Sequence, residues 1–162
     1  MGTLNLSSTV AVTPDNYAGP AFYAYASVAT SLSSSTYTKV LFQSESYDTN
    51  GNYDTSLSRF TPTVAGYYQL NYAVSVANNS FSGRLLVVIY RNGSLNFYSA
   101  SNTGGHTQYG QAGAALVYAN GSTDYFEIYA YQDSGSAKNA DAAANPNSQV
   151  STFFQGCLLR AA

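Results

Sequence analysis

The sequence predicts an all-β protein, and three observations lead to this prediction. Apolar and polar residues alternate with the period of two that is typical of strands, most clearly over residues 66–76. Short segments rich in Tyr, Phe, Val and Leu are separated by turn signals at the spacing of a β-sandwich or barrel. No stretch has the periodicity of a long amphipathic helix.

The chain is expected to consist of an N-terminal arm, residues 1–20, and one domain, residues 21–162. The arm contains the strand-like run "TLNLSSTVAVT". Asn92-Gly93 and Asn120-Gly121 each lie between apolar runs, and both predict tight hairpins because Asn and Gly tolerate positive φ. Eight strands are expected in the domain: residues 21–28, 39–44, 66–76, 83–91, 94–99, 108–118, 123–132 and 150–159. Residues 133–149 lack strand periodicity and are predicted to form an exposed loop.

The strand at residues 66–76 has one apolar and one mostly polar set of side chains. Successive side chains of a strand point to opposite faces, so one set is expected to fill the core. The core set is Tyr68, Leu70, Tyr72, Val74 and Val76. The opposite face of the same sheet is then expected to meet water or a neighbouring subunit.

The charge content excludes several classes of partner. Only 9% of residues are charged, the formal net charge is −2, and the six Lys and Arg are scattered. The chain therefore lacks the basic stripe that binds nucleic acid or an anionic membrane. No apolar segment reaches the roughly 20 residues needed to cross a bilayer, and the start lacks a signal-peptide pattern. Synthesis in a cytoplasm is predicted, with no membrane insertion. The single cysteine, Cys157, is predicted to be a small buried hydrophobe.

Few residues point to catalysis or metal binding. The single histidine, His106, has no Cys or second His to share a metal, and no nucleophile elbow or phosphate-binding glycine motif is present. We therefore predict a protein that is not an enzyme and has no cofactor, and a hydrolase that uses His106 or Asp54 ranks third among the functions. At residues 48–54, "DTNGNYD", an Asx-rich turn is preferred, and a calcium ion shared within an oligomer is the alternative.

Four segments together resemble the globular head of complement C1q and its relatives. They are "SYDTNGNYDTSLSRFTPTVAGYYQLNYAVSV", "VVIYRNG", "LVYANGSTDYFEIYA" and "STFFQGCLLRA". The resemblance covers residues 22–160, and its closing strand, with Phe154, Gly156 and the Leu pair that follows, is its most specific part. It departs from the usual pattern where Ala65 replaces a proline before the central strand and where Thr123 replaces the Gly of a Gly-Asp pair. The resemblance implies a two-sheet jelly roll, shared with tumour necrosis factor, that assembles as a homotrimer.

Similar heads also occur in bacteriophage proteins as fibre tips, trimerisation units and capsid decorations. Because no collagen-like Gly-X-Y repeat is present, we predict a non-enzymatic, homotrimeric virion protein of a bacteriophage, either a capsid decoration or cement protein or a fibre-tip attachment module. Its expected partners are other copies of itself and either other virion proteins or a host-surface receptor. The alternative is a stand-alone C1q-like module that binds carbohydrate or protein.

Two sets of aromatic and loop residues are expected to make contacts. Tyrosine combines an apolar ring with a hydroxyl group, which suits subunit interfaces and adaptable binding loops. Residues of the strands are expected in the core or at a subunit interface: Tyr23, Tyr25, Tyr67, Tyr68, Tyr72, Phe153 and Phe154. Residues of exposed loops are expected to touch a partner or a sugar: Tyr47, Tyr53, His106 and Tyr109.

Overall fold

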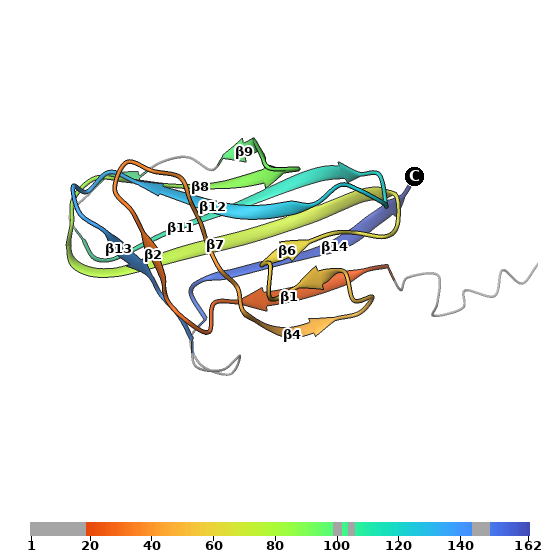
Figure 1. Cartoon of the computed structure of the whole chain (residues 1–162), viewed down its shortest axis with the longest axis horizontal. Helices are drawn as coiled ribbons and strands as arrows, with labels where there is room; N and C mark the ends of the chain where they lie inside the picture. The colour runs from red at the N-terminus through yellow and green to blue at the C-terminus, as the bar shows by residue number, and fades with distance from the viewer. Residues whose placement is uncertain (1–18, 99–101, 104–105, 144–149) are drawn as a thin grey trace, which may run out of the picture.

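The fold is a sandwich of two antiparallel sheets (Figure 1). The computed structural model describes residues 19–98, 102–103, 106–143 and 150–162. In chain order, their strands are β1 (Ala21–Tyr25), β2 (Thr30–Leu32), β3 (Thr38–Lys39), β4 (Ser44–Asp48), β5 (Tyr53–Asp54), β6 (Arg59–Phe60), β7 (Gly66–Phe81), β8 (Arg84–Arg91), β9 (Ser94–Tyr98), β10 (Asn102–Thr103), β11 (His106–Ala119), β12 (Phe126–Gln132), β13 (Lys138–Ala140) and β14 (Phe153–Ala161). Within these ranges, no helix is long and apolar enough to cross a membrane. The prediction of an all-β protein is confirmed.

Each of the two sheets has seven strands. In sheet A the order is β2-β13-β7-β14-β1-β4, and β11 pairs with the other edge of β7. In sheet B the order is β10-β8-β12-β6-β5, with β3 paired to β12 and β9 paired to β8. β7, β11 and β14 run along the long axis of the molecule (Figure 1). These three strands give sheet A a broad surface.

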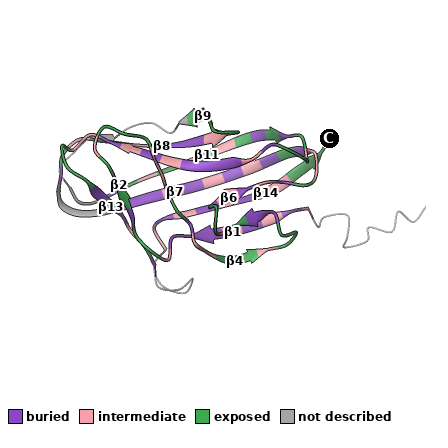
Figure 2. Ribbon diagram, viewed as in Figure 1, coloured by how far each residue is buried: buried purple, intermediate pink, exposed green. Residues whose placement is uncertain are grey.

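The core lies between the sheets and confirms the predicted faces of β7. Its five apolar side chains, from Tyr68 to Val76 at alternate positions, are 0–2% exposed. Buried and less buried residues alternate along this strand (Figure 2). At one end of the core, the ring of Phe22 lies 4.3 Å from that of Phe60 and 5.0 Å from those of both Tyr53 and Phe154. Packed rings of this kind contribute beyond the apolar area that they bury.

One of the two predicted Asn-Gly hairpins is confirmed and the other is wrong. Asn92 and Gly93 have φ of 52° and 78° and connect β8 to its partner β9, as a tight two-residue hairpin requires. Asn120 and Gly121 instead join β11 in sheet A to β12 in sheet B. The Asn120 side-chain oxygen accepts the backbone N–H groups of the next residues of this turn, so the same dipeptide builds an Asx turn between sheets.

The predicted exposed loop at residues 133–149 is corrected in part. β13 lies within it, pairs with β2, and places Ala140 opposite Val76 of β7. Ala140 is fully buried. A strand of three residues is too short to show a period of two, so only its pairing reveals it. β2 was missed for the same reason, and residues 144–149 lie outside the described part of the chain.

Candidate functional site

The candidate site is the outer face of sheet A, which we call the A face. It consists of the side chains that alternate with the buried ones on neighbouring strands, so their positions follow from the pairing register. Its central residues are listed here strand by strand, from β11 across the sheet to β4: Gly110, Ala112, Ala114, Leu116 and Tyr118 of β11, Tyr67, Gln69, Asn71, Ala73 and Ser75 of β7, Phe153, Gln155 and Cys157 of β14, Tyr23 of β1 and Tyr47 of β4.

One end of the A face is apolar and exposed. Tyr67 and Tyr118 are 46% and 42% exposed, and their rings form an edge-to-face pair with centroids 5.5 Å apart. Leu116 on β11 is 56% exposed, and Leu159, at the bulge of β14, is 58% exposed. Monomeric proteins rarely expose contiguous apolar patches, so this end has the character of a protein contact.

The opposite edge of the A face carries a stack of aromatic rings. The ring of Tyr23 lies 5.8 Å from that of Phe153 and 6.2 Å from that of Tyr47, in stacked orientation on both sides. Desolvation, followed by the neighbouring Tyr47, raises the pKa of Tyr23. The Tyr23 hydroxyl therefore stays protonated at neutral pH, and Tyr47 remains half exposed beside it. This edge offers apolar rings and neutral hydroxyl groups.

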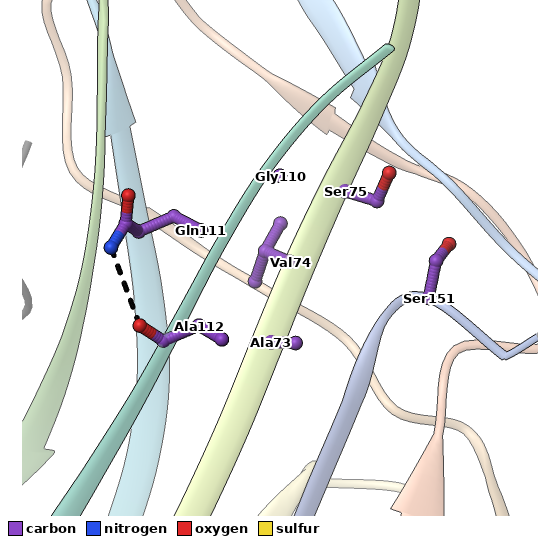
Figure 3. A pocket seen from close by; sticks show the side chains of 7 residues that line it. All are labelled: Ala73, Val74, Ser75, Gly110, Gln111, Ala112 and Ser151. Atoms are coloured by element: carbon purple, nitrogen blue, oxygen red, sulfur yellow. Dashed lines mark hydrogen bonds between the residues drawn. The ribbon is translucent and has the colours of Figure 1, made fainter. Parts of the chain in front are cut away.

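A hollow of about 440 Å³ lies farther along β7 and β11 from the apolar end, at residues 73–75 and 110–112 (Figure 3). It is lined by Ala73, Val74, Ser75, Gly110, Gln111, Ala112 and Ser151. The side chains of Ser75 and Ser151 lie on one side of β7, and Gln111, whose amide donates to the Ala112 carbonyl at 3.3 Å, lies on the other (Figure 3). The Ser75 hydroxyl donates to Asp141 at 2.9 Å. The lining residues are uncharged, and the hollow offers space for a side chain of a partner.

Charged residues are nearly absent from four of the five strands of the A face, and the fifth, β4 at its edge, carries Glu45 and Asp48. Arg160 is the only Lys, Arg, Asp or Glu in β1, β7, β11 and β14. The ion pairs found among the described residues lie on sheet B and its turns, namely Lys39–Glu127, Arg59–Glu127, Arg84–Asp133 and Arg91–Asp124. Depletion of charge is what distinguishes the centre of a protein interface from the rest of a surface.

The structure divides the predicted strand residues between the core and the A face. Tyr25, Tyr68, Tyr72 and Phe154 are buried, with at most 6% exposed. Tyr23, Tyr67 and Phe153 point outward on the A face. Cys157 was predicted to be buried, but it is half-buried because its outward register places it on the A face rather than in the core.

Of the three predicted loop contacts whose side chains the structure describes, only Tyr47 is exposed, at 49%. Tyr53 is buried in β5, and its hydroxyl donates to the Phe42 carbonyl at 3.2 Å. Tyr109 is 2% exposed because it lies on the inward face of β11, where its ring stacks 4.6 Å from that of Phe81. These two are corrections, since neither ring is available to a partner. His106 begins β11, but its side chain lies outside the described part of the chain.

The residues that the sequence reasoning missed on the A face belong mainly to β11. Leu116 and Tyr118 lie two residues apart on either side of the buried Val117 in "GQAGAALVY", and this spacing is the signal that could have found them.

No cluster of three His, Cys, Asp or Glu side chains able to hold a metal occurs among the described residues. In the loop at residues 48–54, the two Asp48 oxygens accept the backbone N–H groups of Asn50 at 3.2 Å and Tyr53 at 2.6 Å. The carboxylate therefore closes an Asx turn.

The fold and the A face define a class of protein, a two-sheet jelly roll with one uncharged, partly apolar sheet surface. The C1q domain family matches residues 21–159, and the chain belongs to this family. Domains of the C1q and tumour necrosis factor type are generally non-enzymatic structural or ligand-binding modules, and they form homotrimers and bind other proteins or receptors.

Several solved structures share the fold at low sequence identity. The globular domain of the zebrafish complement 1qA protein is 15% identical, with a TM-score of 0.62 over 89% of this chain and 99% of that one. Murine APRIL at pH 5.0 is 14% identical, with a TM-score of 0.63 over 87% of this chain and 99% of that one. The vertex protein P5 of bacteriophage PRD1 is 13% identical, with a TM-score of 0.57 over 88% of this chain and 98% of that one. None of the curated protein sequences matches the chain significantly.

Proposed function

We propose that this chain is a non-enzymatic structural protein of a bacteriophage virion and that it assembles as a homotrimer through the A face. The A face is the observation that carries the proposal. Four of its five strands, β1, β7, β11 and β14, together hold a single charged residue, Arg160, and Tyr67, Leu116 and Tyr118 at one of its ends are each about half exposed. Covering such a surface removes apolar area from water without desolvating charges.

The virion role is supported by the fold and by the composition. A vertex protein of a bacteriophage has the same fold, and the neutral, Tyr-rich surface suits permanent contacts between subunits. Residues 1–20 would form an arm that docks on a neighbouring virion protein. The arm joins the domain beside the A face, where the Pro20 carbonyl accepts the Leu158 N–H at 2.8 Å. The protein would either decorate the capsid or form the tip of a fibre that binds a host receptor.

The first experiment measures mass in solution by light scattering after size exclusion. The wild-type chain is expected at three times its mass of 17.2 kDa. Leu116→Arg places a charge in the apolar end of the A face and is expected to give a folded monomer. Leu95→Arg is the matched control, because Leu95 is 48% exposed on β9, away from the A face, and this variant should stay trimeric. A wild-type monomer at micromolar concentration would contradict the assembly.

The second experiment counts copies in purified particles by quantitative mass spectrometry. Many copies per particle, whose loss destabilises the capsid, would indicate decoration. A few copies, together with antibodies to the protein that block adsorption, would indicate a fibre tip. Absence of the protein from purified particles would contradict the virion role.

A stand-alone binding module is the second candidate function. The observation in its favour is the group of tyrosine rings on sheet B, away from the A face, which includes the 38% exposed Tyr37. A trimer that is absent from particles but binds a sugar or protein would favour this candidate.

A further inference from the structure

The outer face of sheet B carries four tyrosine rings in contact, which we call the tyrosine band. They come from three strands or their ends: Tyr37, Tyr90, Tyr129 and Tyr131. Ring centroids are 4.0 Å apart for Tyr90 and Tyr129, 5.1 Å for Tyr37 and Tyr131, and 6.3 Å for Tyr37 and Tyr90. On β12, Tyr129 and Tyr131 alternate with the buried Ile128 and Ala130, so they point away from the core.

The band presents polar groups as well as rings. The hydroxyls of Tyr37, Tyr90 and Tyr129 have no hydrogen-bond partner within the described part of the chain. Desolvation raises the pKa of Tyr90 and of Tyr129, so both hydroxyls remain protonated donors at neutral pH. Tyr37 is 38% exposed, and the other three rings are half-buried against one another. A ligand that lies on the band would meet ring faces and free hydroxyl groups together.

Cationic side chains flank both ends of the band. At one end, Lys39 and Arg59 contact Glu127 at 2.7 and 2.8 Å, and the cations are 24% and 29% exposed against 4% for the carboxylate. At the other end, the Arg84 guanidinium lies 5.7 Å from the Tyr131 ring centroid. Arg84 is 50% exposed, whereas its partner Asp133 is 25% exposed. Glu127 lies beneath its two cations, and Asp133 is half as exposed as Arg84, so the more exposed charges at both ends are cationic.

The shape of the band favours an extended ligand. The outward row that contains Tyr129 and Tyr131 begins just before β12, at Tyr125, whose ring centroid lies 3.8 Å from the Arg59 guanidinium carbon. At about 3.3 Å per residue, the six steps from Tyr125 to Tyr131 span about 20 Å. Only Tyr37 among the four rings of the band is widely exposed. The band therefore offers less apolar area than the hot spot of a protein–protein interface usually supplies.

We propose that the tyrosine band binds a linear acidic oligosaccharide. The apolar C–H faces of the sugar rings would lie on the tyrosine rings, the free hydroxyls would hydrogen-bond to sugar hydroxyls, and the carboxylates or sulfates would pair with Arg84 at one end and Lys39 and Arg59 at the other. This site goes beyond the proposed assembly role. It lies on the sheet opposite the A face, so it stays accessible when the A face is covered.

The test is titration calorimetry on the full-length protein with tetragalacturonate and a heparin tetrasaccharide, and with maltotetraose as the neutral probe. At least one acidic probe is expected to bind, with a dissociation constant that rises with added salt, and maltotetraose is expected to bind more weakly. Tyr37→Ala and Arg84→Gln should each weaken acidic-probe binding about fivefold. Tyr47→Ala is the matched control, because Tyr47 is 49% exposed on the A face, and it should leave binding unchanged.

Three results would overturn the site: no acidic probe bound at millimolar concentration, equal loss in Tyr37→Ala and Tyr47→Ala, or equal binding of a glutamate-rich peptide, which would indicate a protein partner. Circular dichroism verifies that each variant is folded. The mass of the same samples separates the two proposals, because a trimer without sugar binding contradicts only this site, and sugar binding by a monomer contradicts only the assembly.

Discussion

Replacing the buried Asp124 by Asn is expected to reduce the loss of folding stability that the protein shows in acid. Asp124 is 4% exposed and holds two turns together. Its carboxylate accepts from the Arg91 guanidinium at 2.6 Å, from the Asn92 side-chain amide at 2.8 Å and from the Asn120 N–H at 2.9 Å. These bonds favour the charged form, and they lower the pKa of Asp124 from 3.8 to about 2, with the Arg91 hydrogen bond as the largest cause.

The magnitude follows from this shift. One pKa unit corresponds to about 1.4 kcal/mol, so the ionised carboxylate contributes about 2.5 kcal/mol to the free energy of unfolding at pH 7. Because the folded pKa is depressed, this contribution is complete above the unfolded pKa and is lost as the pH falls toward the folded pKa. Between pH 7 and pH 2.5, Asp124 alone should account for a loss of about 1.5 kcal/mol.

The assay is urea unfolding at one protein concentration. Circular dichroism is the signal, because the chain contains no Trp whose fluorescence could be measured. Asp124→Asn should be less stable than wild type at pH 7 by about 2 kcal/mol and should lose about 1.5 kcal/mol less on acidification. Arg91→Met should reduce the acid sensitivity in the same direction, and Glu45→Gln, at an exposed position of β4, should not. If wild type and Asp124→Asn lose equal stability between pH 7 and pH 2.5, the assignment of this contribution to Asp124 is refuted.

Three further changes test packing, charge and assembly. Gly113→Ala places a Cβ 2.5 Å from a buried tyrosine ring of β7 and should cost about 1–3 kcal/mol in thermal unfolding, whereas Gly110→Ala, with its nearest atom at 3.6 Å, should be nearly neutral. Glu127→Gln leaves two partly buried cations without their partner and should cost about 2 kcal/mol in urea unfolding, and an unchanged midpoint would show that water replaces the carboxylate fully. The thiol of Cys157, half-buried on the A face, should react with a maleimide more slowly in wild type than in Leu116→Arg, and equal rates would place it outside the interface.

The features that the sequence alone predicted depend on local chemistry. The period of two in "YYQLNYAVSV" established which side of β7 is buried, because alternation of side chains is a property of any strand. The Asn92-Gly93 hairpin followed from backbone freedom at two adjacent residues. The family resemblance followed from the order of such local segments, and the match over residues 21–159 confirms it.

Contacts between distant segments were decided only by the tertiary structure. Asn120-Gly121 has the same dipeptide as the true hairpin, yet it crosses between sheets because β11 pairs with β7 and β12 pairs with β8. Tyr109 was expected in a loop, and the register of β11 buries it. The A face and the tyrosine band each bring together residues from several strands, and no local pattern encodes which strands become neighbours. Pairing partners are chosen by the packing of the whole sandwich, so surface sites formed across strands can be recognised only once that packing is known.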